Sequence, residues 1–274
     1  MSKKPRGILI AGNWKMNCTQ AETESFFSAL HFQAPLLALA QGYFKSCTLR
    51  ATLFPPMLSL SKASDLAAKT IFPLEIGAQN IHWDKRGAFT GEISGPMALE
   101  AGIKWALVGH SERRQYFNET DETSRKRTES LLDQGFHVIL CVGETRAERE
   151  GGRTAEIVTR QLNAVLKEAG KAASTYLNGT LIIAYEPVWA IGTGLNATPD
   201  QAEEAHRLIR ELLHDRFGSE CATRTPIIYG GSVTTENMES LLACANVDGA
   251  LIGGASLKPE SYAQLLAAGA RALN

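Results

Sequence analysis

Eight short runs of apolar and β-branched residues recur along the 274-residue chain, and segments with helical periodicity separate them. Near-continuous hydrophobic strands are typical of a parallel sheet that is covered on both faces. Helices are expected between them, for example at Thr128–Gln134, Thr154–Ala169 and Pro199–Phe217. The expected strands are Ile8–Trp14, Thr48–Phe54, Glu75–Ile81, Trp105–Ser111, His137–Gly143, Thr180–Pro187, Thr225–Gly231 and Asp248–Ser256.

Eight strand–helix units in about 250 residues predict an α/β fold with a single domain over residues 1–274: a (β/α)8 TIM barrel with eight parallel strands. An open, doubly wound sheet is the alternative. Its first turn normally carries a GxGxxG motif, whereas here that turn reads GNWKMN from Gly12. The connection Ala34–Ser46 has no clear pattern, so a longer first helix and an inserted loop both stay open.

Composition and charge exclude several classes of function. Hydrophobic residues make up 44% of the chain, which is enough to bury a sizeable core. Lys and Arg number 28 against 29 Asp and Glu, a balance that argues against a nucleic-acid partner or a polybasic membrane anchor. No run approaches the roughly 18 apolar residues that a membrane span requires. Five cysteines without a CxxC pair predict free thiols and a cytoplasmic location.

Polar residues follow several strands at their carboxyl ends, where a closed parallel barrel gathers its active site. Each one has a structural explanation by itself: a surface lysine, a hydrogen-bonded core histidine, or a charge at the end of a strand. Independent structural roles would not concentrate on one rim, so their joint placement favours a catalytic site. These residues are Asn13, Lys15, His110, Ser111 and Glu186.

Paired glycines follow the last two strands, at Gly230-Gly231-Ser232 and Gly253-Gly254. Loops at this position often bind phosphate through backbone N–H groups, although paired glycines also form simple tight turns. Together with Lys15 they predict a site for a small anionic substrate. The segment Pro187–Gly194 is typical of a hinged lid whose Gly192 N–H binds the anion; an ordinary loop with a buried tryptophan is the alternative.

Five long segments carry this pattern: AGNWKMN at 11–17, VGHSERR at 108–114, AYEPVWAIGTG at 184–194, YGGSV at 229–233 and LIGGASL at 251–257. In this order they closely resemble the triosephosphate isomerase family over essentially the whole chain. The resemblance implies an isomerase that interconverts dihydroxyacetone phosphate and D-glyceraldehyde 3-phosphate through an enediolate, in glycolysis and gluconeogenesis. It implies no metal and no organic cofactor.

The resemblance also implies a role for each matching residue. Glu186 corresponds to the general base, and His110 to a neutral electrophile beside a helix that begins near Ser111. Lys15 and Asn13 correspond to the groups at the substrate oxygens. This family is itself a standard example of such acid–base assignments, so these roles are not an independent result. The implied phosphate-binding residues are Asn13, Lys15, Gly192, Ser232, Gly253 and Gly254.

Further positions are singled out beside these residues. Ser111 and Glu112 are implied to support it, with Glu112 as the family's buried glutamate near the lysine. Cys141 also matches a family motif, but a thiol inside an apolar strand without an activating neighbour favours a packing role. The long loop from Gln79 to Thr90 enters a partner subunit in the family, which implies a homodimer. A mobile surface loop is the alternative.

Other functions stay open. An isomerase or racemase of a related short-chain ketose phosphate would use the same proton chemistry. A lysine Schiff-base aldolase is disfavoured, because the sixth strand ends in Glu186 rather than a lysine. A catalytically silent sugar-phosphate-binding protein is disfavoured by the intact set of Lys15, His110 and Glu186. Glu203 and His206 share a helix face but lack further ligands, so no metal site is expected.

Overall fold

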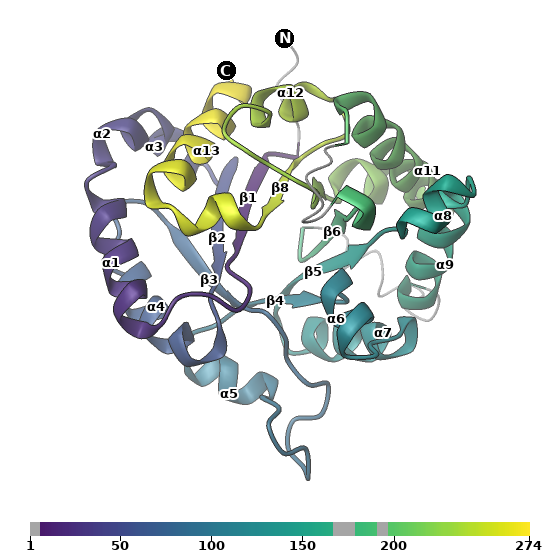
Figure 1. Ribbon diagram of the computed structural model, residues 1–274, viewed down its shortest axis with the longest axis horizontal. Coiled ribbons are helices and arrows are strands. Elements are labelled where there is room, and N and C mark those ends of the chain that lie inside the picture. The colour runs from purple at the N-terminus through teal and green to yellow at the C-terminus, as the bar shows by residue number, and fades with distance from the viewer. Residues whose placement is uncertain (1–5, 167–178, 191–196) are drawn as a thin grey trace.

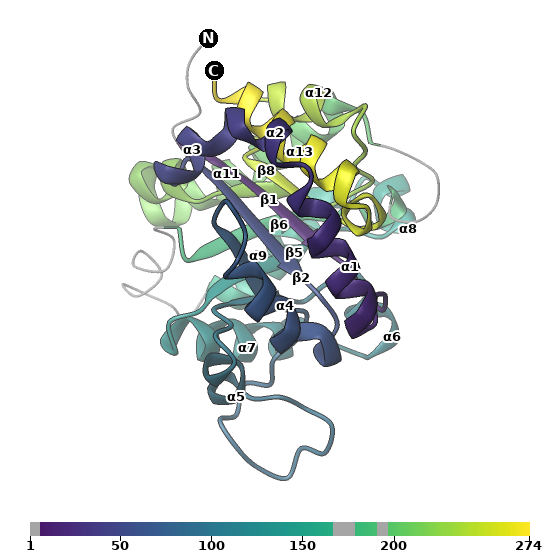
Figure 2. The same cartoon turned by 90° about the vertical axis from the view of Figure 1, so that its left-hand side faces the viewer.

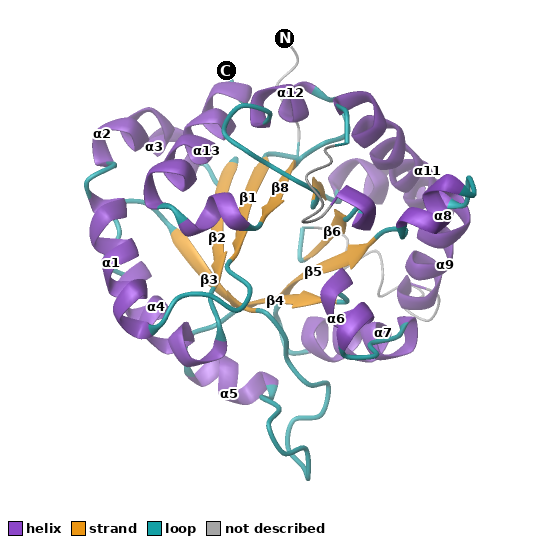
Figure 3. Cartoon of the chain, viewed as in Figure 1, coloured by secondary structure: helices purple, strands orange, loops and turns teal. Residues whose placement is uncertain are grey.

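Eight parallel strands close into a barrel in the computed structural model, which describes residues 6–166, 179–190 and 197–274. Each strand pairs with the next in sequence, and β8 pairs with β1, so the sheet has no edge and the predicted barrel is confirmed. Helices surround the barrel (Figures 1 and 3). The strands are β1 (Ile8–Asn13), β2 (Leu49–Phe54), β3 (Leu74–Ala78), β4 (Trp105–Val108), β5 (His137–Val142), β6 (Leu181–Tyr185), β7 (Ile227–Tyr229) and β8 (Gly249–Ile252).

Most strands end earlier than the sequence analysis expected. The backbone turns out of the sheet where glycine or a polar residue follows the apolar run. Gly109, directly after β4, has a φ of 69°, and Lys15, two residues after β1, has a φ of 53°. Both values lie in the left-handed region, far from the φ of about −120° to −140° of a regular β-strand. Lys15, His110 and Glu186 therefore lie just beyond the ends of their strands.

The helices lie on the outside of the barrel, and two differ from expectation. α7 begins at Asp121 because Thr120 and Thr123 form a capping box at its start. α11 continues to Arg224 past a kink at Gly218, whose φ is 82°. The helices are α1 (Gln20–His31), α2 (Ala34–Leu37), α3 (Gln41–Lys45), α4 (Leu60–Ala67), α5 (Gly95–Glu100), α6 (Ser111–Tyr116), α7 (Asp121–Asp133), α8 (Arg146–Glu150), α9 (Thr154–Leu166), α11 (Pro199–Arg224), α12 (Met238–Ala243) and α13 (Pro259–Ala272), with 3₁₀ turns η1 (Ala38–Ala40), η2 (Met57–Ser59), η3 (Val188–Ala190) and η4 (Gly254–Leu257).

The connection Ala34–Ser46 is a short helical insertion made of α2, η1 and α3. Its apolar residues Leu37 and Phe44 are buried, and the Phe44 ring stacks on that of Phe72 with centroids 4.9 Å apart. α2 and η1 pack against α13, and the Tyr43 hydroxyl is hydrogen-bonded to the side chain of Asn274. The insertion therefore holds the last helix of the chain, on the outside of the barrel.

The core has two parts. One fills the barrel itself with residues such as Leu9, Phe54, Trp105 and Ile139, and the other lies between the barrel and its helices. All five cysteines are free, as the sequence analysis expected. Among the described helices, none is both long enough and apolar enough to cross a membrane.

Candidate active site

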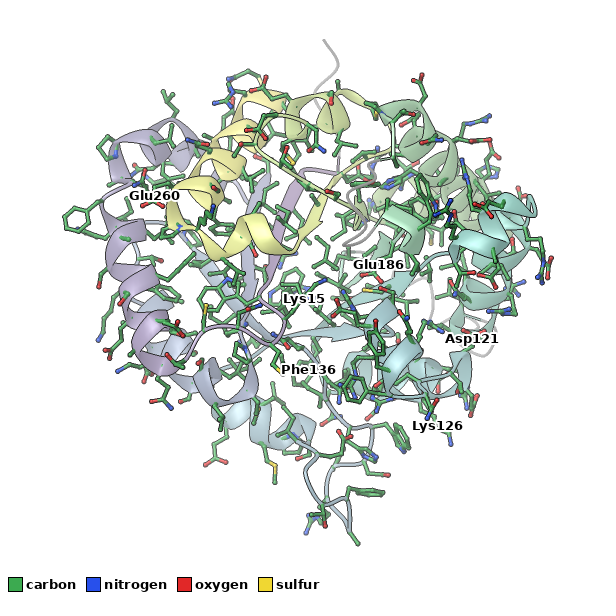
Figure 4. All side chains as sticks on the ribbon, viewed as in Figure 1. Lys15, Asp121, Lys126, Phe136, Glu186 and Glu260 are labelled. Atoms are coloured by element: carbon green, nitrogen blue, oxygen red, sulfur yellow. The ribbon has the colours of Figure 1, made fainter. Side chains whose placement is uncertain are left out.

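Of the predicted rim residues, all but Ser111 line one cavity of about 350 Å³ at the carboxyl ends of the strands. Figure 4 shows Lys15 and Glu186 near the middle of the molecule, and both line this cavity. Lys15 and Glu186 also line a larger cavity of about 950 Å³, together with Ser111 and Glu112. Gly192 lies outside the described residues. The predicted residues that line the smaller cavity are Asn13, Lys15, His110, Glu186, Ser232, Gly253 and Gly254.

Glu186 follows β6 directly and is only 2% exposed. Its Oε2 accepts a hydrogen bond of 2.8 Å from the N–H of Ser111, which is the first residue of α6. Its Oε1 lies 3.2 Å from His110 Nε2 and accepts no hydrogen bond within the described part of the chain. A Cβ at Gly230 would approach the Glu186 Cγ to 2.8 Å, so this glycine makes room for the carboxylate. The Ser111 N–H thus fixes one oxygen of the carboxylate, and the other oxygen is available to accept a proton.

His110 is the N-cap of α6, which begins at Ser111 as the sequence analysis expected. The Glu112 N–H donates to His110 Nδ1 at 3.2 Å. A backbone N–H can only donate, so Nδ1 carries no proton, and the proton of a neutral imidazole must be on Nε2. A neutral ring with an Nε2–H donor therefore faces Glu186.

Lys15 has a left-handed backbone, which costs a residue with a side chain about 1–2 kcal/mol. Its N–H donates to Asn13 Oδ1 at 3.0 Å. Its Nζ lies 2.6 Å from Glu112 Oε1 and, on the cavity side, 3.9 Å from the place of a Cβ on Gly253. Glu112 is thus the partner of the lysine, but its side chain is 37% exposed rather than buried, which corrects that expectation.

Cys141 lies on β5, fully buried against Glu186. Burial raises the pKa of this thiol well above its usual value, and the negative charge of Glu186 raises it further. The thiol therefore stays protonated, and its neighbour works against activation. This environment fits the packing role that the sequence favoured, although the contact with Glu186 was not expected.

Sequence reasoning gave no role to Glu144, a fully buried carboxylate after β5. It accepts hydrogen bonds from the Tyr185 hydroxyl at 3.0 Å and from Trp189 Nε1 at 3.1 Å, and its backbone carbonyl accepts one from the Val188 N–H. These bonds fix the first part of the expected lid Pro187–Gly194. Its remaining part, 191–194, lies outside the described residues. The sequence did carry a signal for Glu144, because this residue lies three positions after Cys141 in the same family motif, CVGE at 141–144.

The loop after β3 projects from the barrel (Figure 2), and Thr90 in it is exposed. Gln79, at its start, turns inward: its side-chain Nε2 donates to the Lys15 carbonyl at 2.8 Å and to the Phe54 carbonyl at 2.9 Å. This contact within the chain was not foreseen, because it joins residues that only the closed barrel brings together. The contact of Thr90 with a partner stays a prediction.

Glu203 and His206 lie on α11, and both contact one loop after α12. Glu203 accepts hydrogen bonds from the backbone and side chain of Asn246, and the Nδ1 of His206 lies 3.2 Å from its carbonyl. In the ranges that the structure describes, no three His, Cys, Asp or Glu side chains are grouped as metal ligands would be. Both side chains thus hold the loop that precedes β8.

Comparisons with known proteins agree on one family. A family model described as triosephosphate isomerase matches residues 8–269. The chain is 45% identical over 261 residues to a triosephosphate isomerase of Solibacter usitatus, covering 95% of this chain and 99% of that protein. It is 44% identical to one of Chlorobium luteolum, covering 96% and 99%. It is also 44% identical to one of Emericella nidulans, covering 93% and 96%.

Proposed function

The chain belongs to the triosephosphate isomerase family, and we propose that its rim residues carry out the reaction that this name describes. It interconverts dihydroxyacetone phosphate and D-glyceraldehyde 3-phosphate. The observation that carries this proposal is the single cavity of about 350 Å³ in which Lys15, His110 and Glu186 meet the glycine loops after β7 and β8. A small phosphorylated sugar needs an acid–base pair and an anion site at adjacent positions, and this cavity offers both.

Glu186 is the proposed general base. The reaction moves a proton from the carbon beside a carbonyl, and a carboxylate oxygen without a hydrogen bond can receive it. The Ser111 N–H on Oε2 holds the carboxylate at 2.8 Å while Oε1 remains available. A positioned base contributes about 10²- to 10⁴-fold to the rate. Because the site is buried, few water molecules compete for the proton.

Negative charge grows on the carbonyl oxygen as the enediolate forms, and two groups are proposed to stabilise it. The Nε2–H of neutral His110 is one donor, and the ammonium group of Lys15 is the other. A preorganised donor of this kind is worth about 3 kcal/mol in the transition state. Glu112, whose Oε1 lies 2.6 Å from the ammonium nitrogen, is proposed to orient the lysine side chain.

The phosphate is proposed to bind at the glycine loops after β7 and β8. Ser232, Gly253 and Gly254 line the cavity there, and glycine allows the backbone to approach an anion closely. The Lys15 ammonium group lies close to Gly253 in the same cavity, and it is proposed to contact both ends of a three-carbon substrate. Asn13, buried beside it, orients the lysine through its Oδ1. The proposal also includes the contact that the sequence predicts between the Gly192 N–H and the phosphate.

A homodimer is proposed for the chain as a whole. Its support is the projecting loop after β3, which exposes Thr90, and the exposed side chain of Met16, 96% accessible beside the site. A cytoplasmic location is proposed as well, since five free thiols suit a reducing compartment.

A coupled isomerase assay in both directions tests the proposed function, with three- and four-carbon ketose phosphates as the panel. Efficient turnover of the three-carbon pair alone is expected. Preferential turnover of a four-carbon substrate would support the related ketose phosphate isomerase instead. Borohydride inactivation in the presence of substrate would indicate a lysine Schiff base, and no turnover of any substrate would leave a binding protein.

A further inference from the structure

Another cavity, of about 690 Å³, lies at the opposite mouth of the barrel, where the strands begin. Its volume is typical of sites for small organic ligands, and the mouths of barrels are common places for such sites. Apolar side chains, among them Ile8, Leu49 and Ile182, form most of its wall. Charged side chains complete the wall, so the electrostatics of the cavity depends on which of their hydrogen-bonding groups are already used.

The two carboxylates in this wall differ in how well they are neutralised. Asp248 is fully buried, and its two oxygens accept from Arg6 Nε and from Arg210 Nη2, each at 2.7 Å. Glu75 is 38% accessible, and its one contact within the described chain is a long one, 3.3 Å from Oε2 to Arg50 Nη2. Two arginines outweigh Asp248, so of the two carboxylates only Glu75 opposes an incoming anion.

Arg50 carries the hydrogen-bond donors that the wall does not use. It lies on β2 in register with Phe54, which fills the barrel interior, and residues two or four apart on a strand share a face. Its guanidinium lies over the Trp105 ring, 4.5 Å from the centroid. Nη2 faces Glu75 at 3.3 Å and His137 Nε2 at 3.5 Å.

The rest of this guanidinium is available to a ligand. Arginine has five N–H donors, and those on Nε and Nη1 of Arg50 make no hydrogen bond within the part of the chain that the structure describes. The side chain is 29% accessible, so solvent reaches it through the cavity. A planar guanidinium with such donors can bind a carboxylate through two parallel hydrogen bonds.

We propose that this cavity binds a small organic carboxylate, whose anionic group Arg50 holds and whose apolar body packs against Ile8, Leu49 and Ile182. One guanidinium with unused donors and a mostly apolar wall favour a single carboxylate on a hydrocarbon body over a phosphate. Among the described residues, none lines both this cavity and the catalytic one. Binding should therefore stabilise the folded chain without competing with the substrate.

Titration calorimetry with 2-naphthoate tests the proposal, because this probe joins one carboxylate to a rigid apolar body. We expect a Kd of about 1 mM or tighter, as for a ligand of this size that fills a formed cavity. The uncharged 2-naphthamide is the matched control and should bind at least about 10-fold more weakly, because it lacks the charge that Arg50 recognises. Inorganic phosphate should not displace 2-naphthoate.

Four variants assign the binding to this cavity. Arg50→Gln should weaken it by about 10-fold or more, and Arg207→Gln, exposed on α11 outside the cavity, should change it by no more than about twofold. Glu75→Gln removes the opposing charge and should tighten binding by about threefold. Thr223→Trp obstructs the cavity from an exposed position and leaves Arg50 in place, so it decides the question if Arg50→Gln does not fold.

NMR of the histidine rings locates the ligand independently. The ring signal that His137→Gln removes should shift when 2-naphthoate is added, because His137 Nε2 lies 3.5 Å from Arg50 Nη2. The signal of His110, in the catalytic cavity, should stay in place. A shift at His110 instead of His137, equal binding of the amide, displacement by phosphate, or wild-type affinity in Arg50→Gln or Thr223→Trp would each overturn the proposal.

Discussion

Glu186 holds its carboxylate between the Ser111 N–H and the His110 ring, and the length of its side chain sets that position. Glu186→Asp withdraws the carboxylate by one methylene, and a misplacement of about 1 Å costs about 10²-fold in rate. We expect kcat to fall by about that factor with an unchanged melting temperature. Steady-state kinetics measures the loss, and Glu260→Asp, at an exposed position in the first turn of α13, serves as the matched control. Wild-type turnover in Glu186→Asp would remove Glu186 from the role of base.

His137 begins β5 at the opposite end of the barrel, where its ring stacks on Trp105. The Gly179 carbonyl lies 3.3 Å from Nδ1 and can only accept, so Nδ1 carries the proton and Nε2 faces the Arg50 guanidinium at 3.5 Å. Burial lowers the pKa of His137, and the positive charges of Arg50 and Lys104 lower it further, although Glu75 and the bond to Gly179 act in the other direction.

This lowered pKa makes stability depend on pH. The unfolded chain takes up the proton at a pH near 6.5, before the folded chain does, so the contribution of His137 is complete above that pH and is lost below it. Between about pH 7.5 and 5.5, wild type should lose up to about 1.4 kcal/mol more unfolding free energy than His137→Gln. Urea unfolding at both pH values measures this difference. Equal losses would show that His137 does not titrate in this range.

Some residue roles could be predicted from the sequence and others could not. Lys15, His110 and Glu186 were identifiable because each interrupts an apolar strand end, and the topology of a barrel brings such ends together. The contact of Gln79 with Lys15 depends on the side-chain geometry of three strands, which no linear pattern contains. The exposure of Glu112 was missed for the same reason. The motif indicates that Glu112 lies near Lys15, but it does not show how accessible the Glu112 side chain is to solvent.

At the scale of elements, the insertion formed by α2, η1 and α3 offers a matched pair of leucines. Leu37 is 1% exposed and Leu39 is 79% exposed within the same segment. Leu37→Ala leaves a cavity against the core and should cost about 2–5 kcal/mol of unfolding free energy. Leu39→Ala should change it by no more than about 0.5 kcal/mol. Chemical denaturation compares the two variants.

Both leucine variants should retain the wild-type kcat/KM at a temperature where they are folded, because the insertion lies outside the barrel rim. A loss of activity in folded Leu37→Ala would mean that this segment is coupled to the site. Equal stability of the two variants would contradict the burial of Leu37.

The strands were predictable as elements because uninterrupted apolar runs leave few alternatives, but their ends were not. The sequence cannot show where a backbone leaves the sheet, as it does near Lys15 and at Gly109. The early start of α7 was readable in principle, since Thr120 and Thr123 form its capping box. The insertion 34–46 was not, because three short helical pieces have no sustained period.

At the scale of the whole molecule, the proposed homodimer predicts a stability that depends on concentration. Subunit association stabilises the folded chain by mass action, so the melting temperature should rise with protein concentration. Thr90→Arg places a charge on the projecting loop and should promote dissociation in sedimentation equilibrium. Leu39→Arg, on an exposed surface away from that loop, is the control. A wild-type mass of one chain at micromolar concentration would contradict the dimer.

The central claim is that Glu186 removes a proton from a sugar phosphate held beside Lys15 and His110. Incubation of wild type and Glu186→Gln with dihydroxyacetone phosphate in deuterium oxide, followed by NMR of the recovered sugars, tests it most directly. The account predicts that wild type incorporates deuterium at the carbon next to the carbonyl and that Glu186→Gln, whose amide cannot accept the proton, does not. Exchange by Glu186→Gln at the wild-type rate, or no exchange by the wild type, would contradict it.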